Sequence, residues 1–160
     1  MAEAKTNAMR ILDRAKISYR MHEYDNDGTA QDGVTVAQKL GVSEQRVYKT
    51  LVAQGADRRF FVFVIPVARE LDLKKAARAV GEKNVELIHV KALLQTTGYI
   101  RGGCSPIGMK KQFDTVVDIS CKNQEMILVS AGKIGRQIEI APQDLLALIV
   151  AKTADLLREL

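Results

Sequence analysis

Residues 60–65, Phe60-Phe61-Val62-Phe63-Val64-Ile65, form an unbroken apolar run. A strand has this composition when both of its faces are covered, because neither set of alternating side chains meets water. Pro66 ends the run, so we expect a strand over residues 59–67. The turn residues Gly55-Ala56-Asp57 connect it to a second, mostly apolar stretch, residues 47–53. The sequence therefore predicts a hairpin whose second strand is central in a sheet.

Shorter elements are predicted on both sides of this hairpin. Capping residues and apolar spacing indicate helices over residues 6–16, 35–41, 72–81, 89–97 and 142–157, with Thr6, Thr35 and Asp72 as N-caps. Short apolar or alternating runs indicate strands over residues 18–24, 85–88, 115–119, 126–130 and 137–140. We expect residues 1–160 to form a single compact α+β domain. Its core would be a mixed, mainly antiparallel β-sheet or a barrel-like sheet, with the helices at the periphery.

The composition limits the class of protein. The 160 residues are 47% apolar and 27% charged, as in ordinary globular domains, and no apolar run reaches the length of a membrane span. Residues 1–6 lack the apolar core of a signal peptide, so we expect a cytoplasmic protein. Two histidines are too few and too scattered for a zinc site, and Cys104 and Cys121 are expected to be free thiols. We expect neither a metal nor another cofactor. The net charge of +5 gives a mild attraction to polyanions.

The second distinctive stretch is Tyr99-Ile100-Arg101-Gly102-Gly103-Cys104-Ser105-Pro106-Ile107-Gly108-Met109-Lys110-Lys111. Its glycines and its proline exclude a regular helix or strand. Glycines let another group approach bare backbone N–H donors, and the basic residues at both ends add positive charge. Such a loop suits an anion, an ester carbonyl or a ribose. The alternative is a tight turn whose glycines serve packing alone.

Two further polar segments lie in apolar surroundings: Lys49-Thr50 within a predicted strand, and Ser130-Ala131-Gly132 at the end of another. A lysine buried without a partner is strongly destabilising, so Lys49 needs an anion, a dipole or a route to water. The simpler alternative is an edge lysine that reaches solvent.

The Lys49-Thr50-Leu51 segment, the stretch from Gly98 to Lys111 and the Ser130-Ala131-Gly132-Lys133 segment together closely resemble the YbaK/EbsC family, in order and spacing along essentially the whole chain. The family comprises small domains similar to the editing insertion domain of bacterial prolyl-tRNA synthetases. The resemblance implies a trans-acting deacylase that removes cysteine from mischarged tRNA(Pro), with Cys-tRNA(Cys) as a further substrate. It also implies that the 3′ end of an aminoacyl-tRNA binds here and that prolyl-tRNA synthetase is a partner. A synthetase pocket discriminates poorly between cysteine and proline, which are similar in size, and a second, hydrolytic site corrects the error.

The resemblance further implies that the thiol of the attached cysteine attacks its own ester and leaves as a cyclic thiolactone. The protein then has to orient the substrate and stabilise the oxyanion. Catalysis is assigned by resemblance to three residues. Lys49 would lie near the terminal adenosine or its phosphate, and the N–H groups of Gly102 and Gly103 would contact the aminoacyl carbonyl and the ribose. The remaining positions are expected to bind substrate: Tyr24, Thr50, Ser130, Ala131 and Gly132.

Two residues leave alternatives open. Cys104 lies between basic residues and has the surroundings of a reactive nucleophile, but the resemblance makes it a packing residue. Some relatives carry an acidic residue where this chain has Gln137, which bears on the choice of amino acid. The alternative functions are a deacylase for alanine or serine that uses water, and a non-catalytic module that binds tRNA or a synthetase.

Overall fold

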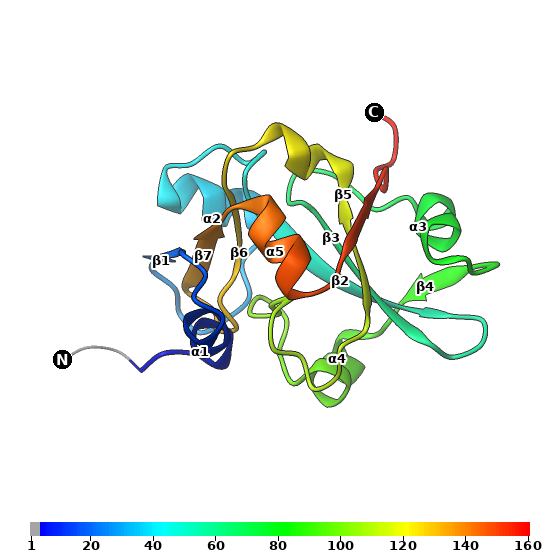
Figure 1. Ribbon diagram of the computed structural model, residues 1–160, viewed down its shortest axis with the longest axis horizontal. Helices are drawn as coiled ribbons and strands as arrows, with labels where there is room; N and C mark the ends of the chain where they lie inside the picture. The colour runs from blue at the N-terminus through cyan, green and yellow to red at the C-terminus, as the bar shows by residue number, and fades with distance from the viewer. Residues whose placement is uncertain (1–3) are drawn as a thin grey trace.

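The computed structural model describes residues 4–160, which form eight strands and five α-helices (Figure 1). The strands are β1 (Arg20–Glu23), β2 (Tyr48–Gly55), β3 (Phe60–Pro66), β4 (Val85–Leu87), β5 (Asp114–Asp118), β6 (Ile127–Ser130), β7 (Arg136–Ile140) and β8 (Lys152–Ala154). The helices are α1 (Asn7–Arg14), α2 (Gly33–Leu40), α3 (Leu73–Val80), α4 (Val90–Thr97) and α5 (Pro142–Leu148), and Ile119–Asn123 form a 3-10 turn. The predicted α+β class is confirmed.

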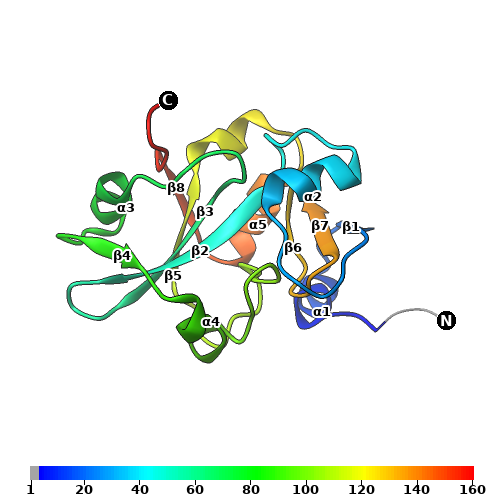
Figure 2. The same cartoon turned by 180° about the vertical axis from the view of Figure 1, so that it is seen from behind.

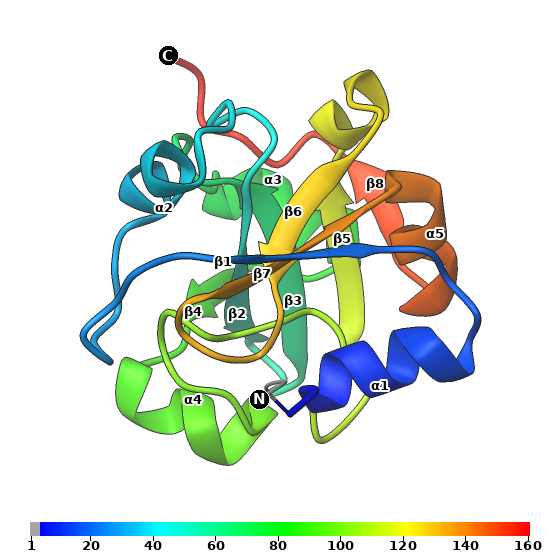
Figure 3. The ribbon, with the colours of Figure 1, turned by 90° about the vertical axis from the view of Figure 1, so that its left-hand side faces the viewer.

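The strands form two sheets. The larger sheet has the order β4-β2-β3-β5-β8 and the smaller sheet the order β1-β7-β6. The pairings β3–β5 and β5–β8 are parallel, and the other pairings within the two sheets are antiparallel. Seen from the side, the smaller sheet lies in front of β2 and β3 (Figure 3). The core is therefore mixed and mainly antiparallel, as the sequence predicts.

Strand β3 is central in the larger sheet and buried on both faces. Val62 and Val64 pack into the core that β6, β7 and α1 share, whereas Phe61 and Phe63 pack into a second core under α3. All four side chains are at most 1% exposed. Full burial of one such side chain stabilises the fold by roughly 1.5–3 kcal/mol. The unbroken apolar run thus fixes β3 as the layer between the two cores.

The helices α2 and α5 lie on opposite faces of the molecule. Figure 1 shows α5 in front of the strands with α2 behind, and Figure 2 shows the reverse. Helix α3 covers the far end of the larger sheet, and α4 lies below it near the glycine-rich stretch (Figure 1). Among residues 4–160, no helix combines the length and the apolar character that a membrane crossing demands.

The two sheets join at one corner. Val47, just before β2, and Leu128 on β6 form an isolated parallel bridge, and the Leu128 N–H donates to the Arg46 carbonyl at 2.8 Å. The Arg46 side chain adds an ion pair across the same corner, with its Nη2 3.2 Å from Oε2 of Glu139 on β7. Beyond the bridge, β2 and β6 belong to different sheets and diverge. The polar residues on these two strands therefore face a common space.

The C-terminal prediction is wrong. The helix predicted to continue to residue 157 ends at Leu148, and Val150 adopts a left-handed φ of 52°. The chain then turns back as β8, which pairs in parallel with β5. Leu156 and Leu157, taken as helical core positions, are buried in the core under α3. Pairing with β8 satisfies backbone groups on the outer edge of β5, which a longer helix would leave without a strand partner.

One helix cap is also different from the prediction. Helix α2 begins at Gly33, two residues before the predicted cap Thr35, and its N-cap is Asp32. The Asp32 carboxylate accepts the Thr35 N–H at 3.0 Å and the Thr35 hydroxyl at 2.7 Å. Aspartate, the stronger acceptor, takes the cap position, and Thr35 supports it. The predicted caps Thr6 and Asp72 are confirmed.

Candidate active site

A cleft of about 380 Å³ opens between the diverging strands β2 and β6. Four parts of the chain line it: β2 with the residue before it, the ends of β6 and β7 that carry Ser130 and Gln137, the loop that leads into α2, and the glycine-rich stretch at Arg101–Cys104. A larger hollow of about 580 Å³ lies between α5, β5 and β8, but none of the predicted site residues lines it. The smaller cleft is thus the candidate site, because it unites all three polar segments of the sequence.

The structure brings five of the eight predicted site residues to this cleft: Tyr24, Lys49, Thr50, Gly102 and Ser130. The other three do not line it. Ala131 is fully buried in the core, and Gly103 and Gly132 are loop residues that are not part of the lining. Ser130 and Gln137 are directly opposite each other in the β6–β7 pairing.

Lys49 is a partly buried cation without a partner. Among residues 4–160 its ammonium group forms no ion pair and no hydrogen bond. Burial lowers the pKa of Lys49, and the negative charge of Glu70 opposes this shift only in part. A half-desolvated positive charge that faces a cleft attracts an anion or a developing oxyanion.

Thr50 also lacks a partner. Its hydroxyl oxygen is buried and makes no hydrogen bond within the described residues. At Thr50, β2 is paired with β3 only. Strand β4 pairs further along, with residues 53–55, and β6 contacts the chain as a bridge only at Val47. The strand edge and the hydroxyl group together offer a ligand both donors and acceptors.

Gly102 marks the contact between two loops. It adopts a φ of +87°, and a Cβ atom there would lie 2.9 Å from both Cα and Cβ of Ala30. Only glycine fits, both for its conformation and for the close approach. The Gly102 N–H makes no hydrogen bond within residues 4–160, whereas the Gly103 N–H donates to the Ile100 carbonyl at 3.0 Å. Of the two predicted N–H donors, only that of Gly102 is therefore available to a ligand.

The rest of the glycine-rich stretch is held by its own side chains. The Tyr99 hydroxyl donates to the Ile107 carbonyl at 2.5 Å, and the Ser105 hydroxyl accepts the Ile107 N–H at 3.2 Å. The Tyr99 ring packs on Gly132, where a Cβ atom would come within 2.9 Å of the ring. Gly132 thus leaves room for the Tyr99 ring and does not line the cleft. Its N–H donates to the Ser130 hydroxyl at 3.2 Å.

Cys104 lines the cleft as a protonated thiol. The residue is 8% exposed, and burial raises the pKa of its thiol to about 11. At neutral pH the thiolate that would act as a nucleophile is therefore almost absent. His22 is paired with Glu139 at 2.7 Å, and His89 is exposed at the start of α4. Neither histidine lines the cleft, so Cys104 has no base in the site to activate it.

Sequence reasoning missed the wall formed by residues 30–33. Gln31 faces the cleft with a buried oxygen, and Gly33 packs so closely on Val67 that a side chain would overlap with it. The polar composition of the loop gave no sign of this role. The only local signal was the pair Asp32-Gly33, which reads equally well as an ordinary helix start.

Residues 29–148 match the family model of the aminoacyl-tRNA editing domain, and the chain belongs to this family. It is 47% identical to EbsC of Enterococcus faecalis (strain ATCC 700802 / V583), over 96% of this chain and 94% of the relative. EbsC is named as a candidate Cys-tRNA(Pro)/Cys-tRNA(Cys) deacylase. The predicted membership in the YbaK/EbsC family is thus confirmed.

Solved structures show the same fold. A candidate trans-editing enzyme for prolyl tRNA synthetase superposes with a TM-score of 0.81 at 22% identity, over 98% of this chain and all of that one. The hypothetical protein APE2540 superposes with a TM-score of 0.87 at 22% identity, over 96% of this chain and all of that one. The arrangement of two joined sheets is therefore shared with proteins of low sequence identity.

Proposed function

We propose that this protein is a trans-acting editing deacylase that removes cysteine from mischarged tRNA(Pro), with Cys-tRNA(Cys) as a further substrate. The observation that carries the proposal is the convergence of Lys49, Thr50, Gly102 and Ser130 on one cleft, in a chain 47% identical to EbsC over nearly its whole length. We take residues 1–160 as one editing domain. A cytoplasmic location follows from the substrate, since aminoacyl-tRNA is made and used there.

The proposed reaction needs no nucleophile from the protein. The substrate's thiol sulfur attacks the ester carbonyl carbon, a C–S bond forms, the C–O bond to the ribose breaks, and the thiol proton ends on the ribose hydroxyl. A cyclic thiolactone leaves. Lys49 and the Gly102 N–H stabilise the charge that develops on the carbonyl oxygen. Tyr24, Thr50 and Ser130 hold the substrate in the bent shape that this attack requires.

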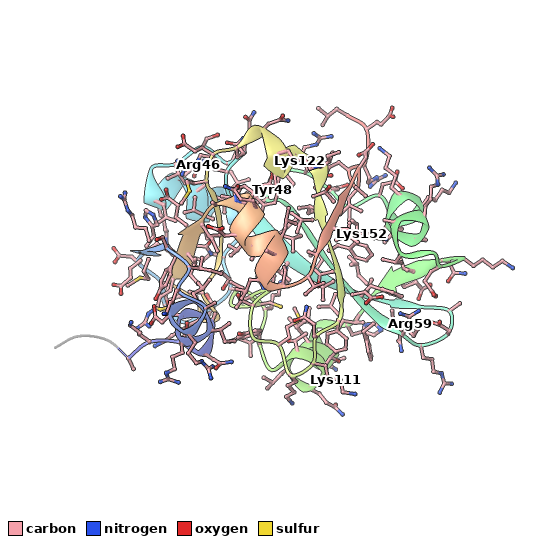
Figure 4. All side chains as sticks on the ribbon, in the orientation of Figure 1. Arg46, Tyr48, Arg59, Lys111, Lys122 and Lys152 are labelled. Carbon is pink, nitrogen blue, oxygen red and sulfur yellow. The ribbon has the colours of Figure 1, made fainter. Side chains whose placement is uncertain are left out.

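Prolyl-tRNA synthetase is the proposed partner. A domain of this size covers little of a tRNA, and Figure 4 shows Arg59, Lys111 and Lys122 at separate places on the molecule. Dispersed positive charge favours weak, salt-sensitive contact with phosphates and no reading of sequence. The tRNA would therefore be selected by the synthetase and the amino acid by the cleft. The trans-editing name of a structural neighbour agrees with this division.

The test is a deacylation assay on tRNA(Pro) charged separately with cysteine, alanine and proline. We expect rapid loss of cysteine only, and no loss with Lys49→Ala, whose fold is checked by circular dichroism. Lys74→Ala on the distant helix α3 is the matched control and should behave as wild type. Loss of alanine would instead indicate a deacylase that uses water. If none of the three aminoacyl esters is hydrolysed, the protein is instead a non-catalytic module that binds tRNA or a synthetase.

A further inference from the structure

Residues 87–100 expose a large share of the apolar side chains that face solvent. Of the nine large apolar residues exposed in residues 4–160, four lie in this segment and form what we call the apolar strip: Leu87, Val90, Leu94 and Ile100. Val90 and Leu94 are 57% and 53% exposed, and they lie on the same face of α4 because they are four residues apart. Leu93 packs against the core and fixes the orientation of the helix. Exposed apolar side chains grouped in this way indicate a surface that another molecule covers.

The apolar strip adjoins the candidate active site at both of its ends. At one end, the Ile88 N–H donates to the Val52 carbonyl at 3.0 Å, directly after residues 47–51, which line the cleft. At the other end, Ile100 precedes Arg101, which also lines the cleft. Figure 2 shows α4 below β2, at the end of the segment that leads from β4. A ligand that extends out of the cleft can therefore reach α4.

The surroundings of the apolar strip are basic. Residues 87–113 contain no aspartate or glutamate and four basic residues: Lys91, Arg101, Lys110 and Lys111. The Lys110 N–H donates to the Thr97 carbonyl at 2.9 Å, so the last two lysines lie at the C-terminal end of α4. Lys111 lies beside α4 at the lower edge of the molecule (Figures 1 and 4). Within residues 4–160, none of the four basic side chains forms an ion pair. Cations around apolar side chains suit a single-stranded nucleic acid, which has charged phosphates and flat bases.

The walls of the cleft show on which side a nucleic acid strand would leave it. Gln137 is 6% exposed at the deep end of the cleft, whereas Arg101 is exposed at its mouth. The wall before α2 continues into an open hollow with three exposed acidic residues: Asp25, Asp27 and Asp32. Phosphates are repelled by these carboxylates and attracted by Arg101 and the lysines near α4. A strand whose end occupies the cleft would therefore leave it over α4.

We propose that the apolar strip and its basic neighbours bind the unpaired nucleotides that precede the terminal adenosine of the tRNA, an inference that rests on the proposed deacylase function. The bases pack on Val90 and Leu94, and the phosphates contact Lys91, Arg101 and Lys111. Such contacts read no base edges, so the surface holds the 3′ end of any tRNA and leaves the choice of tRNA to the synthetase. Nucleotides that do not react thereby help to hold the ester in the cleft.

The test compares two substrates that carry the same reacting ester. One is 3′-O-cysteinyl-adenosine, and the other is a short single-stranded RNA with the 3′ sequence of tRNA, cysteinylated on its terminal adenosine. Only the RNA can reach α4. The ratio of the two kcat/KM values is measured for wild type, Leu94→Gln and Lys111→Gln. Affinity for the uncharged RNA is measured by fluorescence anisotropy at several salt concentrations.

Two matched controls lie on other parts of the molecule. Ile119→Gln replaces an apolar side chain that is 47% exposed, and Lys74→Gln replaces an exposed lysine on α3. Glutamine is uncharged and is well tolerated in helices, so Leu94→Gln should fold as wild type does. Circular dichroism checks the fold of each variant.

We expect wild type to prefer the RNA ester by at least about tenfold, and Leu94→Gln to lower this preference about fivefold, because base packing is lost. Lys111→Gln should weaken RNA binding and reduce the slope of log Kd against log salt by about 0.7, the value for one phosphate of a single strand. Leu94→Gln should weaken binding without changing the slope. Both controls should match wild type.

An unchanged preference and an unchanged RNA affinity in Leu94→Gln and Lys111→Gln would overturn the inference. So would equal losses in the two controls. If Leu94→Gln keeps its RNA affinity but loses stimulation by prolyl-tRNA synthetase, the apolar strip is a protein interface and the inference is wrong. If wild type hydrolyses neither ester, the proposed deacylase function fails, and the anisotropy measurements decide separately whether α4 binds RNA.

Discussion

Cys104 is the side chain in the cleft that most resembles a nucleophile. Because burial raises the pKa of its thiol to about 11, we predict that Cys104→Ser keeps kcat/KM within about threefold of wild type. The buried hydroxyl group should destabilise the protein by about 1–3 kcal/mol. Deacylation kinetics and urea unfolding measure the two effects. Complete loss of activity in a folded Cys104→Ser variant would contradict the packing role.

Lys49 is predicted to lower the stability of the free protein. Burial lowers its pKa, so the folded state binds the lysine proton less tightly than the unfolded chain does. The penalty is fully present below the folded pKa and disappears as the pH rises toward the unfolded value of 10.5. Lys49→Met should therefore be more stable than wild type at neutral pH, with a gap that narrows toward pH 10.5. Chemical denaturation at several pH values measures it. A stability difference between Lys49→Met and wild type that does not change with pH would show that burial of the charge is not its cause.

The sequence predicted some site residues and missed others for identifiable reasons. Lys49 and Thr50 interrupt an apolar strand, and Gly102 lies in a loop that no regular element explains, so each carries a local signal. Gln31 carries none, since one glutamine in a polar loop is unremarkable until the loop is seen to cover a cleft. Ala131 and Gly132 adjoin Ser130 in sequence but point into the core and toward Tyr99.

The start of helix α2 depends on close contact between Gly33 and Val67. A side chain at Gly33 would overlap with the Val67 side chain, so Gly33→Ala has to push α2 and the wall before it outward. We predict a loss of about 1–3 kcal/mol in the free energy of unfolding, together with a raised KM. The double variant Gly33→Ala/Val67→Ala should recover most of the lost stability and most of the lost substrate affinity. Thermal unfolding and deacylation kinetics test this. If Val67→Ala does not restore stability in the Gly33→Ala background, the overlap with Val67 is not the source of the strain.

The turn between α5 and β8 holds Val150 in a conformation that L-residues avoid. Its φ is 52°, and the side chain is 81% exposed, so little packing compensates. Val150→Gly should raise the free energy of unfolding by about 1 kcal/mol. Val150→Ala, which keeps the Cβ atom, should give only a small part of this gain. Equal effects of the two substitutions would mean that the backbone conformation is not the source of strain.

The same turn explains the failed helix prediction. Residues 142–157 have leucine spacing that suits one long helix, and no glycine or proline interrupts it after Pro142. The chain leaves the helix because β8 pairs with β5, about 35 residues earlier in the chain. Local sequence propensity carries no information about a strand partner that is so distant in the sequence. The hairpin β2–β3, by contrast, was predicted well because its turn and both strands are contiguous.

The cleft is a product of the entire fold. It exists because two sheets join at the Val47–Leu128 bridge and then diverge, and because two loops meet over the gap at Gly102 and Ala30. The sequence predicted the class of fold and three polar segments, and their resemblance to one family predicted that they meet. Neither pattern nor composition predicted the wall of residues 30–33 or the depth of Gln137.

The proposed reaction depends on attack by the substrate's own thiol, and a comparison of two substrates isolates this step. Cysteinyl-tRNA(Pro) and seryl-tRNA(Pro) differ by a single atom, sulfur or oxygen, and the cleft contains no activated nucleophile of its own. We predict that wild type releases cysteine rapidly, as a thiolactone detected by mass spectrometry before it hydrolyses, and leaves the serine ester intact. Comparable release of serine, or release of cysteine directly as the free acid, would exclude attack by the substrate's thiol and indicate attack by water.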